Sequence, residues 1–235
     1  MMNRVLQPIN LVLLLGISFL YSCNNSKEKV AHELLIMETT PEKETPSEAM
    51  KFDYDTTQWK EITELSGAVL DIRYATDNNF TKNQIYPCPR CFLRPVMANK
   101  ILTLQKDIKK RYGMSLKLFD CYRPRPAQQK LWNIVPDARY VTPPNKGSMH
   151  NRGLAVDITL IDKDGNELEM GTEYDFFGQE AYTTNTALPK DILKNRKILT
   201  KLMNIHGMKG IRTEWWHFSL KSEKAPLDEW EWECE

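Results

Sequence analysis

Residues 148–160, SMHNRGLAVDITL, constrain the fold more than any other part of the chain. From Leu154 onward, large apolar residues alternate with small or polar ones, which is the period of a β-strand that lays one face on a core. Gly153 stands just before the strand and permits a sharp turn. We therefore expect His150 to return beside the strand, and Asp157 to point into a cleft on the face opposite the apolar residues.

Helical and strand patterns alternate along the rest of the chain, which predicts an α+β domain. Helices are expected at 95–113, 125–135 and 189–207, and strands at 69–74, 115–123, 154–160 and 213–220. A hydrophobic fraction of 41% suits one domain plus tails. The net charge is +1, from 32 basic and 31 acidic residues, so charge gives no reason to expect nucleic acid as a partner.

The N-terminal residues resemble a targeting segment. Arg4 precedes an apolar run from Leu11 to Leu20 that is shorter than the roughly 20 residues a membrane-spanning helix needs. The sequence LYSC, ending at Cys23, resembles a bacterial lipoprotein processing site. Residues 1–22 are therefore expected to be a signal peptide, with Cys23 lipidated and the protein held on the periplasmic side of a membrane. The alternative is an ordinary signal peptide with a chance cysteine.

Residues 23–52 are rich in Glu, Lys, Thr, Ser and Pro, a composition that does not bury enough apolar surface to fold. This stretch is expected to be a flexible tether, and its His32 to have no functional role. The folded domain then covers residues 53–235.

A third metal-ligand candidate lies in TEWWHFSL, residues 213–220. In an ideal strand Glu214 and His217 face opposite sides, so both reach one site only if a turn or bulge lies near Glu214. A zinc hydrolase needs three protein ligands, an open position and a carboxylate base. His150, Asp157, His217 and Glu214 supply that set. The alternative is a histidine packed between tryptophans in a core sheet. His206 is expected to be structural, at the end of a helix.

Five motifs resemble one family. SMHNRGLAVD fits S-x-H-x-x-G-x-A-x-D and EWWH fits E-x-W-H, which are motifs of zinc peptidases that share a fold with DD-carboxypeptidases and the hedgehog signalling domain. LDIRYATDNNF, YRPRPAQ and MGTEYDFFG are similar to the VanX-type D-alanyl-D-alanine dipeptidases in particular. The resemblance covers residues 67–220. It implies a single α+β domain in which a small antiparallel sheet, flanked by helices, carries the zinc site.

The resemblance also implies roles for individual residues. One zinc ion per chain would be held by His150, Asp157 and His217, with Glu214 as general base and Arg123 stabilising the oxyanion. For Arg123 the alternative is a surface arginine in a turn. The ends of the substrate would be bound by Ser148, Asp120 and Asp175, for which a structural role is the alternative.

The activity implied is hydrolysis of D-Ala-D-Ala in cell-wall peptide turnover, with this small dipeptide as the partner. One alternative keeps the zinc site but makes the enzyme a peptidoglycan carboxypeptidase or stem-peptide endopeptidase. Another is a zinc-containing binding module without catalysis. Glu214, which stands close to His217, argues against the inactive module because it is the base that such a module would not need.

Four cysteines depart from the family pattern: Cys88, Cys91, Cys121 and Cys234. In an exported protein an even set favours structural disulfides, and four cysteines allow three pairings. A redox-active pair or a second zinc site at Cys88 and Cys91 are the alternatives. A bridge to Cys121 would restrain the loop that carries Arg123.

Overall fold

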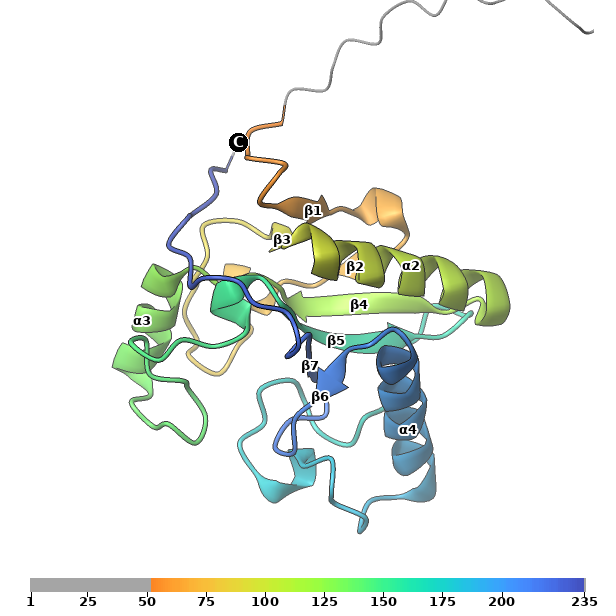
Figure 1. Ribbon diagram of the computed structural model, residues 1–235. Helices are drawn as coiled ribbons and strands as arrows, with labels where there is room; N and C mark the ends of the chain where they lie inside the picture. Colours follow the sequence, from red (N-terminus) through yellow and green to blue (C-terminus); the bar gives the residue numbers. More distant parts are fainter. Residues whose placement is uncertain (1–51, 235) are drawn as a thin grey trace, which may run out of the picture. The chain divides into compact units, whose positions relative to one another are not determined.

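The computed structural model describes residues 52–234 (Figure 1). The predicted signal peptide, Cys23, the tether and His32 lie outside these residues. Within the described part of the chain, no helix is both long and apolar enough to cross a membrane.

The fold is built on a five-stranded sheet with the strand order β2-β4-β5-β7-β6. The pairs β4–β5, β5–β7 and β6–β7 are antiparallel. The strands are β2 (Val69–Leu70), β4 (Ser115–Asp120), β5 (Ala155–Ile161), β6 (Lys209–Gly210) and β7 (His217–Ser219). The predicted α+β class is confirmed, but the sheet is mixed and not purely antiparallel as expected.

One edge of the sheet differs from the purely antiparallel arrangement, because β2 pairs parallel to β4. The chain between them passes through β3 and α2, the long crossover that parallel neighbours require. The predicted strand at 69–74 is also shorter than expected. It ends at Leu70, and the chain turns at Arg73–Ala75 into a 3-10 helix that buries Tyr74.

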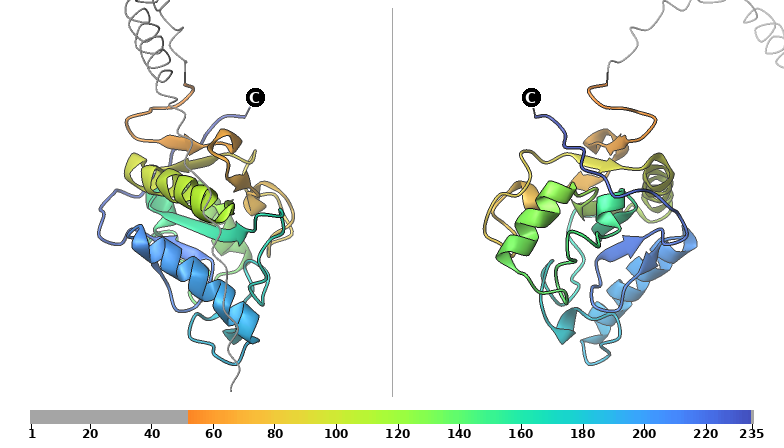
Figure 2. Two further views of the ribbon diagram at one scale, coloured as in Figure 1. Left: turned by 90° about the vertical axis from the view of Figure 1, so that its right-hand side faces the viewer. Right: turned by 60° about the vertical axis from the view of Figure 1, so that its left-hand side comes forward.

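Three helices surround the sheet: α2 (Pro95–Tyr112), α3 (Arg125–Ile134) and α4 (Lys190–Ile205). Figure 2 shows α2 and α4 over one face of the sheet, while α3 lies on the other side of the molecule. The apolar stripe of α2, made of Met97, Ile101, Leu104 and Ile108, is fully buried, and Gly113 ends this helix with a φ of +69°. Such left-handed residues at helix ends favour glycine.

A second sheet has two strands, β1 (Lys60–Ile62) and β3 (Cys91–Leu93). Two disulfides attach this region to distant parts of the chain. Cys91 in β3 is bonded to Cys121, just after β4, and Cys88 is bonded to Cys234. The expectation of structural disulfides is confirmed, and Cys88 and Cys91 are not bonded to each other.

The C-terminal strap, residues 225–234, runs back across the start of the domain. Its Asp228 donates its backbone N–H to the carbonyl of Asn151 and accepts from the N–H of Arg125. The carbonyl of Trp230 accepts from the Tyr122 hydroxyl at 2.9 Å. Since Asn151 and Tyr122 adjoin His150 and Arg123 in sequence, the strap supports the segments that carry the candidate site.

Candidate metal centre and catalytic site

Strand register places three polar residues in one row across the sheet. Asp157 in β5 lies opposite His217 in β7 on one side and opposite Asp120 in β4 on the other. Residues directly opposite on neighbouring strands point to the same face. The register of β4 shifts between Leu118 and Asp120. Because of this shift Asp120, and not Phe119, lies opposite Asp157.

His150 reaches this row from a 3-10 turn, His150–Arg152, that precedes β5. The turn ends at Gly153, whose φ is +66°, and a side chain there would meet the Trp59 ring at 2.6 Å. Glycine is therefore required both by the backbone conformation and by the close approach of Trp59. The predicted return of His150 toward the strand is what the structure shows.

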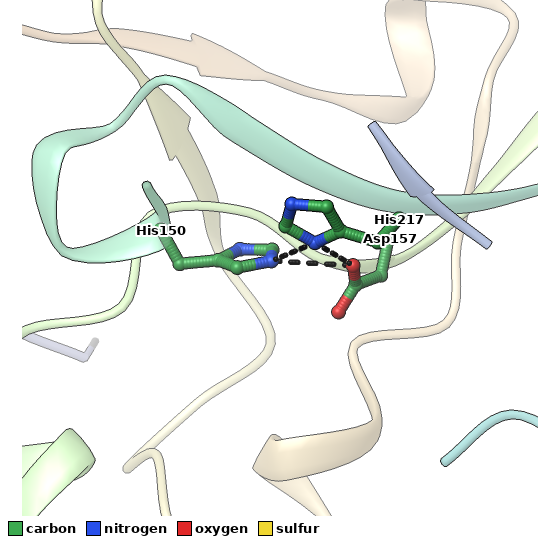
Figure 3. A group of neighbouring side chains, drawn as sticks. All are labelled: His150, Asp157 and His217. Carbon is green, nitrogen blue, oxygen red and sulfur yellow. Dashed lines mark hydrogen bonds and ion pairs between the residues drawn. The ribbon is translucent and has the colours of Figure 1, made fainter. Parts of the chain in front are cut away.

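Three donor atoms from these residues converge (Figure 3). His150 Nε2 lies 3.1 Å from His217 Nδ1 and 3.2 Å from Asp157 Oδ1, and His217 Nδ1 lies 3.0 Å from the same Asp157 oxygen. All three residues are buried. In the described part of the chain, this is the one group of histidine, cysteine or acidic residues arranged to hold a metal ion.

The hydrogen bonds around these residues fit a bound cation. His150 Nδ1 donates to the carbonyl of Cys121 at 2.7 Å, which leaves Nε2 as a lone-pair donor facing the centre. Asp157 accepts from the Tyr174 hydroxyl at 3.0 Å through its other oxygen. Both partners orient a ligand from behind, as the outer contacts of metal sites do.

The charges of the neighbouring histidines favour the ionised form of Asp157. Burial opposes the charge, but the neighbouring His150 and His217 outweigh it, so the pKa of Asp157 lies well below its usual range. The pKa of His150 is raised, because the carboxylates of Asp157 and Asp120 outweigh the opposing effect of burial. A positive charge at the centre is thus stabilised, and a metal cation would satisfy both histidines without a proton between them.

Asp157 is less open than the sequence pattern suggests. Both faces of β5 are covered, and Asp157 is only 3% exposed. The reason is Tyr174, whose ring stacks on Phe119 and whose hydroxyl bonds to Asp157. The cleft beside the row is lined by the two histidines, while Asp157 lies behind them and is not part of the cleft wall.

That cleft has a volume of about 800 Å³. Four other residues singled out by the sequence or the resemblance were Glu214, Arg123, Ser148 and Asp175, and all of them line it. They come from four different segments of the chain. The fold therefore brings the residue expected as general base, the arginine expected at the oxyanion and two residues expected to bind substrate to one cleft beside the metal-ligand group.

Glu214 lies in an irregular bend, and β7 begins three residues later at His217. This bend is the departure from ideal strand geometry that a shared site for Glu214 and His217 requires. Burial raises the pKa of Glu214 above its ordinary value, and the charge of Asp157 adds to the effect. A carboxylate with a raised pKa is suited to accept and return a proton near neutral pH.

Arg123 and Asp120 form a buried ion pair. Arg123 donates to one Asp120 oxygen through Nη2 at 2.6 Å and through Nε at 3.1 Å. The other Asp120 oxygen accepts from the Tyr86 hydroxyl at 2.7 Å. Asp120 is fully buried and is absent from the cleft wall, whereas Arg123 is on it. Asp120 thus holds Arg123 from behind, where the resemblance implied that it would touch substrate.

Asp175 occupies a left-handed backbone conformation, with a φ of +59°. Its carboxylate accepts from the Tyr74 hydroxyl at 2.9 Å. Burial raises the pKa of Asp175 well above the ordinary value, and the negative charge of Asp157 raises it further. The carboxylate therefore lacks a full counter-charge in the protein itself, which suits it to bind a cationic group of a ligand.

Ser148 donates from both its backbone N–H and its hydroxyl to the side-chain oxygen of Asn151. It faces the cleft next to His150. His206, in contrast, caps the end of α4 and lies 3.6 Å from Asp107, outside the site.

Sequence reasoning missed the residues behind the site. Tyr74, Tyr86 and Tyr174 each donate a hydroxyl to a site carboxylate. Arg196 on α4 donates to the carbonyls of Met170, Glu180 and Tyr182, which bracket the loop that carries Asp175. Two of the tyrosines stand in the quoted motifs LDIRYATDNNF and MGTEYDFFG, but their roles depend on distant parts of the chain.

Comparison with known proteins gives one consistent result. The model of peptidase family M15, described as D-ala-D-ala dipeptidase, matches residues 56–231. A D-alanyl-D-alanine dipeptidase of Escherichia coli (strain K12) is 37% identical over 64% of this chain and 78% of its own. Another from Enterococcus faecalis (strain ATCC 700802 / V583) is 30% identical over 69% of this chain and 90% of its own.

A solved structure also resembles the chain distantly. It is the vancomycin resistance D,D-dipeptidase VanXYg in complex with a D-Ala-D-Ala phosphinate analogue. The match has 16% sequence identity and a TM-score of 0.31, over 69% of this chain and 66% of that chain.

Proposed function

This chain belongs to the D-Ala-D-Ala dipeptidase family, and we propose from that premise that it hydrolyses free D-Ala-D-Ala to two D-alanines during cell-wall peptide turnover. The observation that carries the proposal is the cleft shared by the His150–Asp157–His217 group, Glu214 and Asp175. This cleft combines a metal-ligand group, a carboxylate base and a second carboxylate suited to a free amine.

The proposed cofactor is one zinc ion per chain, held by His150 Nε2, Asp157 Oδ1 and His217 Nδ1. Two imidazoles and one carboxylate are a donor set that zinc accepts in hydrolases. When bound, zinc would supply Lewis-acid polarisation to water and to the peptide carbonyl.

The protein residues then perform the proton transfers and place the charges. Glu214 takes a proton from the attacking water and returns it to the leaving amine, which its raised pKa favours. Arg123 lines the cleft, and its positive charge stabilises the charge that develops on the carbonyl oxygen. Asp120 keeps that guanidinium in place through two hydrogen bonds.

Recognition of a dipeptide requires both charged ends to be bound only one peptide bond apart. Asp175 is proposed to bind the free ammonium, because its carboxylate is partly buried at the cleft wall and, among the described residues, accepts a hydrogen bond only from the Tyr74 hydroxyl. Ser148 is proposed to bind the other end of the substrate. A charge buried without a partner is costly, so a substrate that lacks the ammonium is disfavoured at Asp175.

A substrate panel tests this proposal. The purified domain is assayed with D-Ala-D-Ala, its L-isomers, N-acetyl-D-Ala-D-Ala and a stem pentapeptide. We expect kcat/KM for the free dipeptide to exceed that for the acetylated one by a factor of about 10⁴, as for sites that bind a polar group of the substrate. Equal values for these two substrates would instead identify a carboxypeptidase. Activity that survives exhaustive chelation would remove the metal from the proposal.

The proposed location is the periplasmic side of a membrane, with a lipid on Cys23. The lipoprotein-like sequence around Cys23 supports it, as do two disulfides, which persist in oxidising compartments. In that place the enzyme would scavenge D-Ala-D-Ala released from the wall. Cys23→Ala should move the protein from the membrane fraction to the soluble fraction of the cell envelope. An unchanged distribution would contradict the anchor.

A further inference from the structure

The metal ligand His150 is oriented by a carbonyl that belongs to a disulfide-bonded residue. His150 Nδ1 lies 2.7 Å from the carbonyl oxygen of Cys121, and Cys121 is bonded to Cys91. Both cysteines are buried. The only covalent link between β3 and the end of β4, within the described residues, is therefore made at the residue that holds the ligand.

Asp120, the last residue of β4, also lies behind the ring, with its Oδ2 3.4 Å from His150 Nδ1. The stretch after β4 that carries the Cys121 carbonyl has few supports of its own. β4 ends at Asp120, so Cys121 and the residues after it lack the continuous ladder of the main sheet. One backbone bond, from Tyr122 N–H to the Phe92 carbonyl at 2.9 Å, joins this stretch to β3. Another joins Arg123 N–H to the His150 carbonyl at 3.2 Å. A segment held by isolated hydrogen bonds gains positional precision from a covalent tie.

We propose that the Cys91–Cys121 disulfide is a positioning element for the metal site, which sets metal affinity by fixing the carbonyl that orients His150. A carbonyl that accepts from Nδ1 keeps the imidazole in the tautomer whose Nε2 is free to bind metal, and holds the ring at the correct angle. Without the disulfide the carbonyl shifts, and both the tautomer and the ring orientation become mixed.

The second disulfide provides a matched control. Cys88–Cys234 closes a chain segment of 146 residues, against 30 for Cys91–Cys121. Longer closed segments restrict the unfolded chain more, so loss of the control bond should destabilise the protein at least as much. Neither Cys88 nor Cys234 contacts a residue of the metal-ligand group. Comparison of the two variant pairs therefore separates a general loss of stability from a specific loss of metal affinity.

The test compares Cys91→Ala/Cys121→Ala with Cys88→Ala/Cys234→Ala and wild type. Alanine is used because a free thiol would itself bind zinc. Zinc affinity is measured by competition with a chromophoric chelator. We expect the first pair to bind zinc about tenfold more weakly than wild type, as for the loss of outer contacts in other zinc sites. The control pair should stay within about twofold, as expected for a distant change.

A second readout does not depend on the metal. Nitrogen NMR of the metal-free protein, recorded at a pH above the raised pKa of His150 where the ring is neutral, should show the Nδ1–H tautomer in wild type and in the control pair, and a mixture in Cys91→Ala/Cys121→Ala. Should the alanine pair fail to fold, Cys91→Ser/Cys121→Ser, which fills more of the space, takes its place. If the serine pair also fails while the control pair folds, the bond supports the fold as a whole and the positioning role is overturned.

This inference rests on the proposed function only through the binding of metal by His150. Equal zinc affinity in both pairs and in wild type, with an unchanged tautomer, would overturn the positioning role and leave the dipeptidase proposal intact. A wild-type protein that binds no zinc would instead remove the metal site from both.

Discussion

Asp175 combines an uncommon backbone conformation with a charge that burial disfavours. A φ of +59° is rare for residues other than glycine and is tolerated best by asparagine and aspartate. The same residue has a pKa raised well above the ordinary value, mainly by burial and then by the charge of Asp157. Conformational strain and unfavourable charge gathered at one position are typical of residues kept for function.

Asp175→Asn should therefore make the metal-free protein more stable and the zinc-loaded enzyme less active. Asparagine accepts the left-handed conformation and can still accept from the Tyr74 hydroxyl. A folded-state pKa above the unfolded value means that wild-type stability falls as pH rises above about 4 and through the raised pKa. The variant should thus gain on the order of 1 kcal/mol at neutral pH and nothing at low pH. Denaturant unfolding at several pH values measures this, and an equal gain at every pH would contradict it.

Glu214→Gln should separate metal binding from turnover. Glutamine keeps the shape of the side chain but accepts no proton, so kcat should fall by a factor of about 10²–10⁴ or more. Because Glu214 is outside the group of ligand atoms, zinc affinity should remain close to that of wild type. Zinc competition and steady-state kinetics on one preparation check both parts. Near wild-type turnover would assign the base to another residue.

At the level of residues, the metal ligands were readable from the sequence and their supports were not. His150 and Asp157 stand seven positions apart around a glycine, Gly153, which permits the sharp turn that brings them together. The tyrosines that orient the site carboxylates come from segments far apart in the chain. Tyr86 and Asp120, for example, are 34 residues apart. No local pattern links such partners, because only the tertiary packing brings them together.

At the level of secondary-structure elements, β4 shows why the sequence does not reveal on which face of the sheet Asp120 lies. In a regular strand Asp120 would lie on the same face as Leu118. That face is the one opposite to the face that carries Asp157. The register shift between Leu118 and Asp120 turns the side chain to the face of the metal ligands. Such a shift has no signature in SLKLFDCYR. The helices were predicted closely, because proline and glycine mark their ends.

The loop after β5 depends on one residue of α4. Arg196 is buried and its guanidinium reaches three carbonyls, at 2.7 Å from Met170, 2.9 Å from Glu180 and 3.2 Å from Tyr182. Burial lowers the pKa of Arg196, and no neighbouring carboxylate among the described residues offsets the effect. The arginine therefore closes the loop that carries Asp175 by binding its two ends.

Arg196→Met should destabilise the protein by on the order of 2–4 kcal/mol, because three carbonyls lose their donor, one in a buried and two in partly buried hydrogen bonds. The KM for D-Ala-D-Ala should rise more than kcat falls, since the displaced loop carries Asp175, the residue proposed to bind the substrate ammonium. Lys197→Met, at an exposed position on the same helix, is the control. Hydrogen exchange across residues 170–182 locates the effect. Unchanged exchange in this loop would show that Arg196 acts elsewhere.

For the whole molecule, metal binding and folding should be linked. The three ligands come from two strands and a turn that meet only in the folded state. Zinc at about 100 times its Kd should stabilise the protein by about 2.7 kcal/mol. His217→Ala should lose this gain, and His206→Ala, at the end of α4, should retain it. Thermal unfolding with and without zinc measures the difference. A gain that persists in His217→Ala would place the metal elsewhere.

The strap at the C-terminal side has a mechanical consequence. Because Cys234 is bonded to Cys88, a pull from beyond Cys234 is carried into the segment before β3. Trp230 and Trp232, which pack on Phe92, then cannot be peeled away one after the other. An unfoldase or an exopeptidase that starts from this end would have to cut or reduce the bond, or unravel most of the domain at once. Resistance to such attack depends on the rate of unfolding and not on the equilibrium free energy of unfolding.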